Sequence, residues 1–156
     1  MRRQDREILA WDEIEAIINQ CKVCRVAFRD DEEIYIVPMN FGYKREDENL
    51  SFYFHGAKKG KKAELMEKSA CKVGFEMDCE HGLKIGETAC QYGYKYASLI
   101  GQGTIEIVQA IDEQKEGLDL LMKHQTHECF EFNEAMLQSV YVYKLTTKHY
   151  SAKRCR

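Results

Sequence analysis

The chain has 156 residues, which is enough for one compact domain and too few for two. Hydrophobic residues make up 44% of it and charged residues 31%, which excludes a wholly disordered polymer. Its 23 basic and 26 acidic residues give a net charge of −3, so no overall positive field attracts nucleic acid or anionic lipid. No apolar run reaches the roughly 18 residues of a membrane span, and residues 1–7 lack the apolar core of a signal peptide. We therefore expect a single cytoplasmic domain over residues 1–156.

The first half of the chain is expected to form a helix followed by strands. Residues 11–20 carry apolar side chains at helical spacing, and Asp12 with Glu15 resembles a capping box. The charged stretch at 44–49 is interpreted as a turn. Pro38 cannot donate to a β-ladder, so the chain should bulge or leave the sheet there. The antiparallel strands predicted in this half are residues 23–29, 34–40 and 50–55.

The second half is expected to contain longer strands. Residues 71–77 alternate apolar and polar side chains, which is typical of a strand with one buried face. Residues 79–90 lack periodicity and are expected to form a loop. The strand-like stretch at 92–108 contains Gly101 and Gly103. A bend at these glycines would allow one strand to form part of two sides of a barrel. The other predicted elements are a helix over 59–69, a helix capped by Asp112 and a last strand from 140 to about 148.

This order of elements indicates the fold class. Runs of strands joined by short turns, with helices between some of them, favour an antiparallel β-barrel with flanking helices over an alternating α/β sheet. Gly101-Gln102-Gly103 is followed by β-branched strand residues rather than a helix, so it is not a dinucleotide-binding turn. The pattern alone therefore predicts a mainly β protein.

The clearest chemical signal is the segment Phe52-Tyr53-Phe54-His55-Gly56-Ala57-Lys58-Lys59-Gly60-Lys61-Lys62-Ala63. A predicted strand ends at His55, the glycines allow close backbone approach, and lysines crowd the first turns of the next helix. Free N–H groups at a helix start attract anions, whereas lysines there oppose the helix dipole unless an anion compensates them. This conflict predicts a phosphate site. The alternative is a solvated basic patch, and the residues alone leave both open.

His55 alternates with Tyr53 and lies on the strand face opposite Phe54. A histidine at a strand end can donate to a ligand or transfer a proton, because its ordinary pKa is about 6.5. The alternative is a surface histidine bonded to backbone.

The cysteines do not indicate a metal site. The seven cysteines are an odd number spread along the chain, so reduced thiols are expected. Cys21 and Cys24 form a lone C-x-x-C, and no second pair completes a tetrahedral set. His124, His127 and Cys129 resemble a metal half-site only loosely. We therefore predict no metal.

Several motifs are shared with a known family. Residues 35–43 read Tyr-Ile-Val-Pro-Met-Asn-Phe-Gly-Tyr, and residues 53–62 contain Tyr-Phe-His-Gly-Ala followed by Gly-Lys-Lys. Further matching motifs lie at residues 1–8, 24–28, 71–78 and 96–103. Together they resemble the pyridoxamine-phosphate-oxidase-related flavoproteins, and within them the nitroimidazole-resistance-protein group.

This resemblance implies an FMN-binding split β-barrel that forms a homodimer with flavin between the subunits. It implies that Lys61 and Lys62 bind the FMN phosphate. Ser98 is a further candidate contact, from the same or the partner chain. The other implied flavin contacts are Val37, Pro38, Asn40, Phe41, His55, Gly56 and Ala57.

The function expected from this resemblance is an FMN-dependent oxidoreductase that takes hydride from a nicotinamide donor and reduces a small acceptor such as a nitroaromatic. His55 is the candidate catalytic residue, as a donor or proton relay beside the flavin ring. Residues 144–148 do not reproduce the arginine-rich substrate motif of the pyridoxamine-phosphate oxidases, which disfavours vitamin-substrate oxidation. The alternatives are a non-catalytic flavin-binding or sensing protein and, less favoured, a metal- or haem-binding protein.

Overall fold

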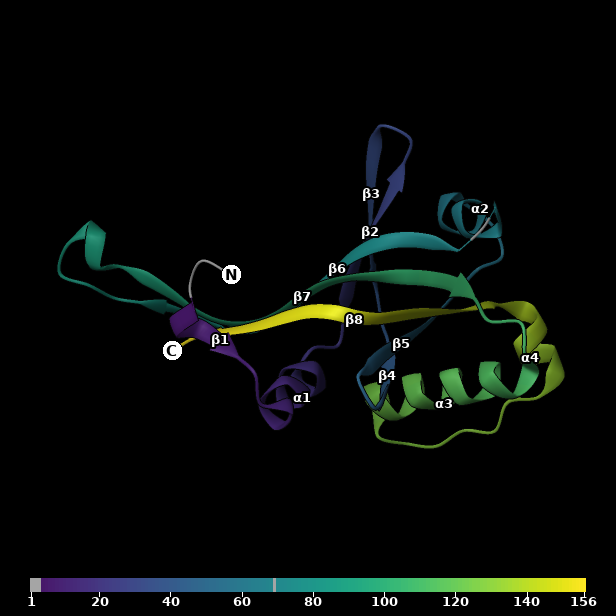
Figure 1. Cartoon of the computed structure of the whole chain (residues 1–156). Helices are drawn as coiled ribbons and strands as arrows, with labels where there is room; N and C mark the ends of the chain where they lie inside the picture. The colour runs from purple at the N-terminus through teal and green to yellow at the C-terminus, as the bar shows by residue number, and fades with distance from the viewer. Residues whose placement is uncertain (1–3, 69) are drawn as a thin grey trace.

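The computed structural model of the chain describes residues 4–68 and 70–156, so Ser69, the predicted end of the second helix, and residues 1–3 of the first shared motif lie outside it. Eight strands form one sheet in which every pairing is antiparallel (Figure 1). Seven of them follow the order β3-β2-β6-β7-β8-β5-β4, and β1 pairs with the end of β8. The mainly β fold with flanking helices that the sequence predicts is confirmed.

The bounds of the elements are as follows. The strands are β1 (Glu7–Ile8), β2 (Cys24–Asp30), β3 (Glu33–Met39), β4 (Gly42–Glu46), β5 (Asn49–Gly56), β6 (Cys71–Lys84), β7 (Gly93–Ile107) and β8 (Tyr141–Cys155). The α-helices are α1 (Trp11–Gln20), α2 (Lys61–Lys68), α3 (Ile111–Thr126) and α4 (Glu134–Ser139), and 3-10 turns cover η1 (Gln4–Arg6) and η2 (Ala89–Gln91). None of the helices within the described residues is long and apolar enough to cross a membrane.

α1, α2 and α3 form where the sequence predicts helices, whereas α4 was not predicted, and the N-terminal caps of α1 and α3 differ from the prediction. α1 spans the predicted residues and buries Ile14, Ile17 and Ile18 against the sheet. The capping box predicted there is wrong, because Ala10 occupies the N-cap position and no side chain caps the helix. The cap predicted at the start of α3 is wrong for the same reason, since Ala110 precedes the helix. Both helices therefore depend on packing of their apolar faces.

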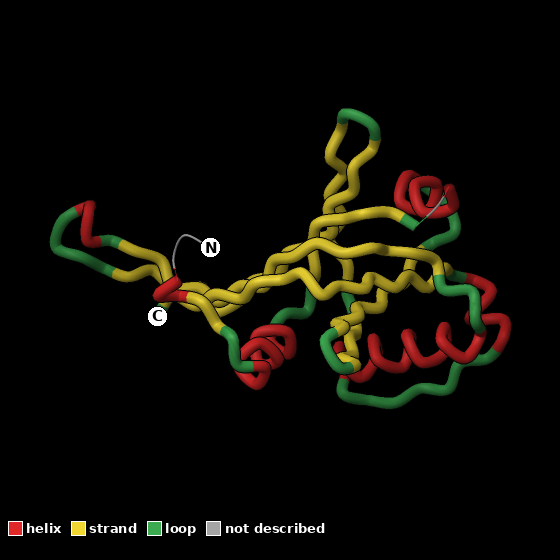
Figure 2. Tube along the Cα trace, in the orientation of Figure 1, coloured by secondary structure: helices red, strands yellow, loops and turns green. Residues whose placement is uncertain are grey.

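The long strands β6, β7 and β8 extend further than the sequence pattern indicates. The loop predicted at 79–90 is wrong in its first part, because β6 continues to Lys84. Its pairing with β7 shifts register between Cys79 and Gly82, and Glu80 has a positive φ of 59°. This bulge breaks the period of two that identifies a strand. Beyond it, residues 80–95 project from the rest of the molecule as a hairpin, the β6–β7 arm, which is clear in Figure 2. β8 likewise continues to Cys155 instead of ending near residue 148.

The charged stretch at 44–49 is a strand in its first half rather than a turn. β4 pairs with β5 at one end of the strand order. Edge strands in natural proteins carry charged side chains that prevent further pairing, and this explains why the stretch resembles a turn. The other end of the order is β3, where Pro38 is tolerated because an edge strand has one unpaired side. The chain leaves the sheet after Met39, one residue later, as predicted.

The bend predicted in β7 is present and depends on glycine. The register of β7 against β8 shifts between Gln102 and Thr104. A Cβ atom on Gly101 would lie 2.6 Å from the carbonyl oxygen of His149, and one on Gly103 would lie 2.4 Å from that of Thr146. Only glycine allows the two backbones to approach this closely.

Close backbone contact also joins α3 to the sheet. A Cβ atom on Gly42 of β4 would lie 2.2 Å from the backbone nitrogen of Leu121 in α3. Leu118 and Leu121 are buried on the face of α3 that covers β4, β5 and β8. α1 and α3 lie on one side of the long strands and α2 on the other (Figure 1).

Gly42→Ala should therefore lower the free energy of unfolding by about 3 kcal/mol, because neither backbone can yield without moving α3. For a domain of this size the melting temperature should fall by about 6–12 °C. Gly82→Ala is the matched control, since its Cβ would meet only the Lys95 side chain at 3.7 Å. Thermal unfolding followed by circular dichroism measures both, and equal melting temperatures would contradict the packing argument.

Candidate functional site

The predicted phosphate segment lies where β5 meets α2. β5 ends at Gly56, residues 57–60 form a bend, and α2 begins at Lys61. Gly60 has a φ of 96°, in the left-handed region that favours glycine. Its carbonyl accepts a hydrogen bond of 3.1 Å from the backbone N–H of Glu64, which closes the first helical turn.

Lys62 is half-buried and lacks a carboxylate partner. Its ammonium group lies 3.5 Å from the Sδ atom of Met39 and 5.1 Å from the ring centroid of Tyr143. Within residues 4–68 and 70–156, no carboxylate lies within ion-pair distance of it. Burial lowers the pKa of Lys62, because the charged form loses hydration that a thioether and an aromatic ring replace poorly. An anion bound here would restore that lost stabilisation.

Gly56 and Tyr143 form the surface on which Lys62 rests. A Cβ atom on Gly56 would lie 2.4 Å from the Lys62 Nζ atom, so a larger residue would displace the ammonium group. Tyr143 is fully buried, and its hydroxyl is the buried side-chain oxygen that has no hydrogen-bond partner among the described residues. Burial raises the pKa of this hydroxyl to about 12, so it remains a neutral donor. Neither Met39 nor Tyr143 was predicted as a site residue. Only the pairing of β8 with β5 brings Tyr143 beside this bend, and no local pattern indicates it.

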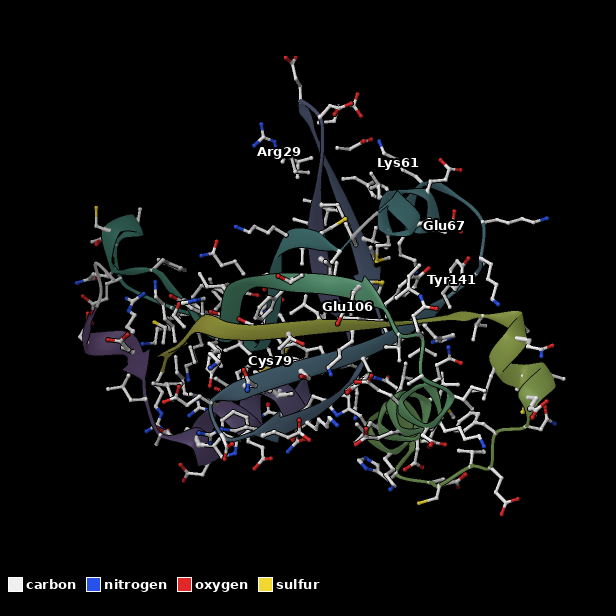
Figure 3. The ribbon with its side chains drawn as sticks, turned by 45° about the vertical axis from the view of Figure 1, so that its right-hand side comes forward. Arg29, Lys61, Glu67, Cys79, Glu106 and Tyr141 are labelled. Atoms are coloured by element: carbon white, nitrogen blue, oxygen red, sulfur yellow. The ribbon has the colours of Figure 1, made fainter. Side chains whose placement is uncertain are left out.

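Lys61 occupies a different environment from Lys62. Its ammonium group lies 2.9 Å from Asp30 and 3.2 Å from Glu33, the residues that flank the turn of the β2–β3 hairpin, and 5.2 Å from the ring centroid of Tyr35. Figure 3 shows its side chain on the side of α2 that faces this hairpin. The two carboxylates raise the pKa of Lys61. The lysine pair predicted from the sequence is thus one compensated and one uncompensated cation.

His55 is exposed on the other face of β5. Alternation along the strand places its side chain with Tyr53, whereas Gly56 lies on the face of Phe54. Neighbouring atoms remove part of its hydration, which lowers the pKa of His55 below 6.5, and the positive charge of Lys62 lowers it further. The imidazole is therefore neutral at pH 7 and is able both to donate and to accept a hydrogen bond.

The end of β3 places the predicted ring contacts on different sides. Val37 is half-buried and Pro38 is exposed. The side-chain amide of Asn40 donates to the Lys22 carbonyl at 2.9 Å. Phe41 is fully buried, with its ring centroid 5.5 Å from that of Phe52. Within one chain, then, the Phe41 ring belongs to the core, while Pro38 faces solvent.

Ser98 lies on β7, a different strand from the one that leads into the bend at 57–60. It is half-buried and pairs with Asp78 of β6 and Lys153 of β8. No hydrogen bond or ion pair among the described residues links Ser98 to Lys61 or Lys62.

None of the seven cysteines, all of which lie in the described part of the chain, forms a disulfide. Burial raises the pKa of Cys24 to about 12 and raises that of Cys21 further, so both remain protonated. Among the described residues no three His, Cys, Asp or Glu side chains are placed to hold a metal ion.

Known structures share this architecture. A protein from Bacteroides thetaiotaomicron, assigned to 5-nitroimidazole antibiotic resistance, superposes with a TM-score of 0.75 at 28% identity, over 95% of this chain and 88% of that one. The FAD and heme binding protein from Mycobacterium smegmatis gives a TM-score of 0.81 at 17% identity, over 97% and 74% of the two chains. The flavocytochrome Anf3 from Azotobacter vinelandii gives 0.79 at 16% identity, over 100% and 72%. The last two similarities show the fold alone.

The sequence comparisons give one family. No curated protein matches the chain. The profile of the family described as pyridoxamine 5'-phosphate oxidase matches residues 10–154, which is nearly the whole chain. The chain therefore belongs to the pyridoxamine 5'-phosphate oxidase family.

Proposed function

We propose that this chain is a cytoplasmic FMN-dependent oxidoreductase that passes electrons from a nicotinamide donor to a small acceptor such as a nitroaromatic. The observation that carries the proposal is the half-buried Lys62 ammonium group without a carboxylate partner. The flavin and 5-nitroimidazole descriptions of the similar structures support the cofactor and the acceptor class. The seven free cysteines agree with a reducing compartment.

Lys62 is the main phosphate ligand in this proposal. Its charge is uncompensated, and the first N–H groups of α2 and the Tyr143 hydroxyl supply further donors near it. Lys61 already has two carboxylate partners, Asp30 and Glu33. Its attraction for the phosphate is therefore weaker than that of Lys62. Bound FMN would supply the hydride chemistry. His55 would donate a hydrogen bond to the ring or transfer a proton there, while Val37, Pro38, Asn40, Gly56 and Ala57 would line the ring through backbone and side chains.

A second copy of the chain would complete the site. His55 and Pro38 are exposed on a single chain, and no contact among the described residues joins Ser98 to Lys62. The outer face of β3 and β7 carries the exposed apolar residues Ile34, Ile36 and Ile100, which a homodimer would bury. Light scattering that gave the mass of one chain, 18.3 kDa, at micromolar concentration would contradict this assembly.

The purified protein should bind FMN stoichiometrically and show flavin absorbance. Under anaerobic conditions NADH or NADPH should bleach that absorbance in a stopped-flow experiment, and a nitroaromatic should restore it. A protein that ignores added FMN would refute the proposal. A bound flavin that stays oxidised with both donors would indicate the alternative, a non-catalytic flavin-binding protein.

Lys62→Gln should weaken FMN binding about tenfold to a hundredfold, because it removes a charge-assisted hydrogen bond to the phosphate. Its affinity for riboflavin, which lacks the phosphate, should stay unchanged. The melting temperature without cofactor should not fall, since the variant no longer buries an unpaired charge. Lys59→Gln on the same bend is the exposed control. Equal FMN affinities in the two variants would remove Lys62 from the site.

His55→Gln should lower turnover at least tenfold while the dissociation constant of FMN changes less than threefold. The variant should also lose one pH dependence of stability. Because folding lowers the pKa of His55, its contribution to stability is present above pH 6.5 and is lost as the pH falls through the folded pKa. Wild type and variant should therefore diverge in melting temperature below pH 6.5. Unchanged turnover would remove the catalytic role.

A further inference from the structure

A cavity lies across the long strands from α2. It has a volume of about 780 Å³ and lies between α1, β4 and α3. Figure 1 shows these three elements below the long strands, with α2 above them. The volume is within the range of small-molecule sites. We call it the α1–α3 pocket and define it by Trp11, Lys22, Tyr43, Arg45, Lys123 and His124.

The charge of this pocket is opposite to that of the whole chain. Four cations, namely Lys22, Lys44, Arg45 and Lys123, line it against the single carboxylate of Glu15. The chain as a whole has a net charge of −3. Carboxylates just outside the lining compensate two of these cations, so attraction of an anionic ligand depends on the other two.

Two of these cations have carboxylate partners and two do not. Lys44 lies 2.9 Å from Glu116, and Lys123 forms an ion pair with Asp119. By contrast, the Lys22 ammonium group donates to the backbone carbonyl of His124. The Arg45 Nε atom donates to the backbone carbonyl of Asp47 at 2.9 Å. No carboxylate among the described residues pairs with Lys22 or Arg45, so each keeps donors for a ligand.

The walls of the pocket are flat and aromatic. The guanidinium carbon of Arg45 lies 4.3 Å from the ring centroid of Trp11. Tyr43 meets His124 edge-on, with ring centroids 5.6 Å apart. Stacked guanidinium and aromatic surfaces of this kind favour a planar ring as the ligand.

His124 lines the pocket and is held in place through one ring nitrogen. Its Nε2 atom lies 2.8 Å from the carbonyl oxygen of Cys21. A carbonyl only accepts, so Nε2 carries the proton and Nδ1 keeps a lone pair. Burial lowers the pKa of His124, and the charges of Lys22 and His127 lower it further, so the ring is neutral at pH 7.

From this arrangement we propose that the α1–α3 pocket binds a planar aromatic anion. Arg45 and Lys22 contact its carboxylate or phosphate group, and its ring lies against Trp11 and Tyr43. The pocket shares no residue with the proposed flavin site, and Figure 1 shows α2 across the long strands from α1 and α3. The two sites adjoin at Asn40, whose side-chain amide donates to the Lys22 carbonyl.

The test uses the full chain and two matched probes, naphthalene-2-carboxylate and its uncharged carboxamide. Calorimetry should give a sub-millimolar dissociation constant for the carboxylate and at least tenfold weaker binding for the carboxamide. Trp11 is the only tryptophan in the chain, so its single indole N–H resonance should shift on binding. Naphthalene phosphate, as a third probe, distinguishes which anionic group the pocket prefers.

Variants locate the binding. Arg45→Gln and Lys22→Gln should each weaken naphthalene-2-carboxylate at least tenfold, whereas Lys115→Gln on α3, outside the pocket, should not. Lys62→Gln should leave this binding unchanged, and Arg45→Gln should leave FMN binding unchanged. Loss of binding at one site can therefore be distinguished from loss of binding at the other. Equal binding of the charged and uncharged probes, unchanged affinity in both pocket variants, or displacement of FMN by the carboxylate would overturn the proposal.

Discussion

The burial of Lys62 without a carboxylate partner is the constraint on which the functional argument depends. An ammonium group that loses hydration needs a compensating charge or strong acceptors, and here it has a thioether and an aromatic ring. The neighbouring Lys61 shows the ordinary solution, because two carboxylates lie within 3.2 Å of it. Lys61 has carboxylate partners and the adjacent Lys62 has none, which indicates that Lys62 binds an external anion.

The sheet creates this environment by bringing distant segments together. β5 supplies Gly56, which leaves room for the ammonium group, and β8 supplies Tyr143, which lies beside it. β3 supplies Met39 from the opposite end of the strand order. A substitution in any of these strands would change the hydration of Lys62 without touching the lysine itself. The site therefore depends on strand pairing across the fold and not on a single sequence motif.

The two proposed sites have similar arrangements of charged and aromatic side chains. Each contains a cation without a carboxylate partner among the described residues, and an aromatic ring lies beside that cation. They differ in access, because Lys62 is half-buried under a helix start whereas Arg45 is exposed at the rim of a wide pocket.

The sequence by itself determined the mainly β class, α1, the strand ends around Pro38 and the bend at Gly101 and Gly103, because apolar period, proline and glycine act locally. It also located the lysine segment, since lysines at a helix start oppose the helix dipole. It did not predict the full length of β6, where a bulge interrupts the alternation, nor β4, whose charges protect an edge. Only the tertiary structure decided which lysine lacks a partner, because Asp30, Glu33, Met39 and Tyr143 reach the helix through strand pairing. Such pairing depends on contacts between residues far apart in the chain, which local sequence patterns do not specify.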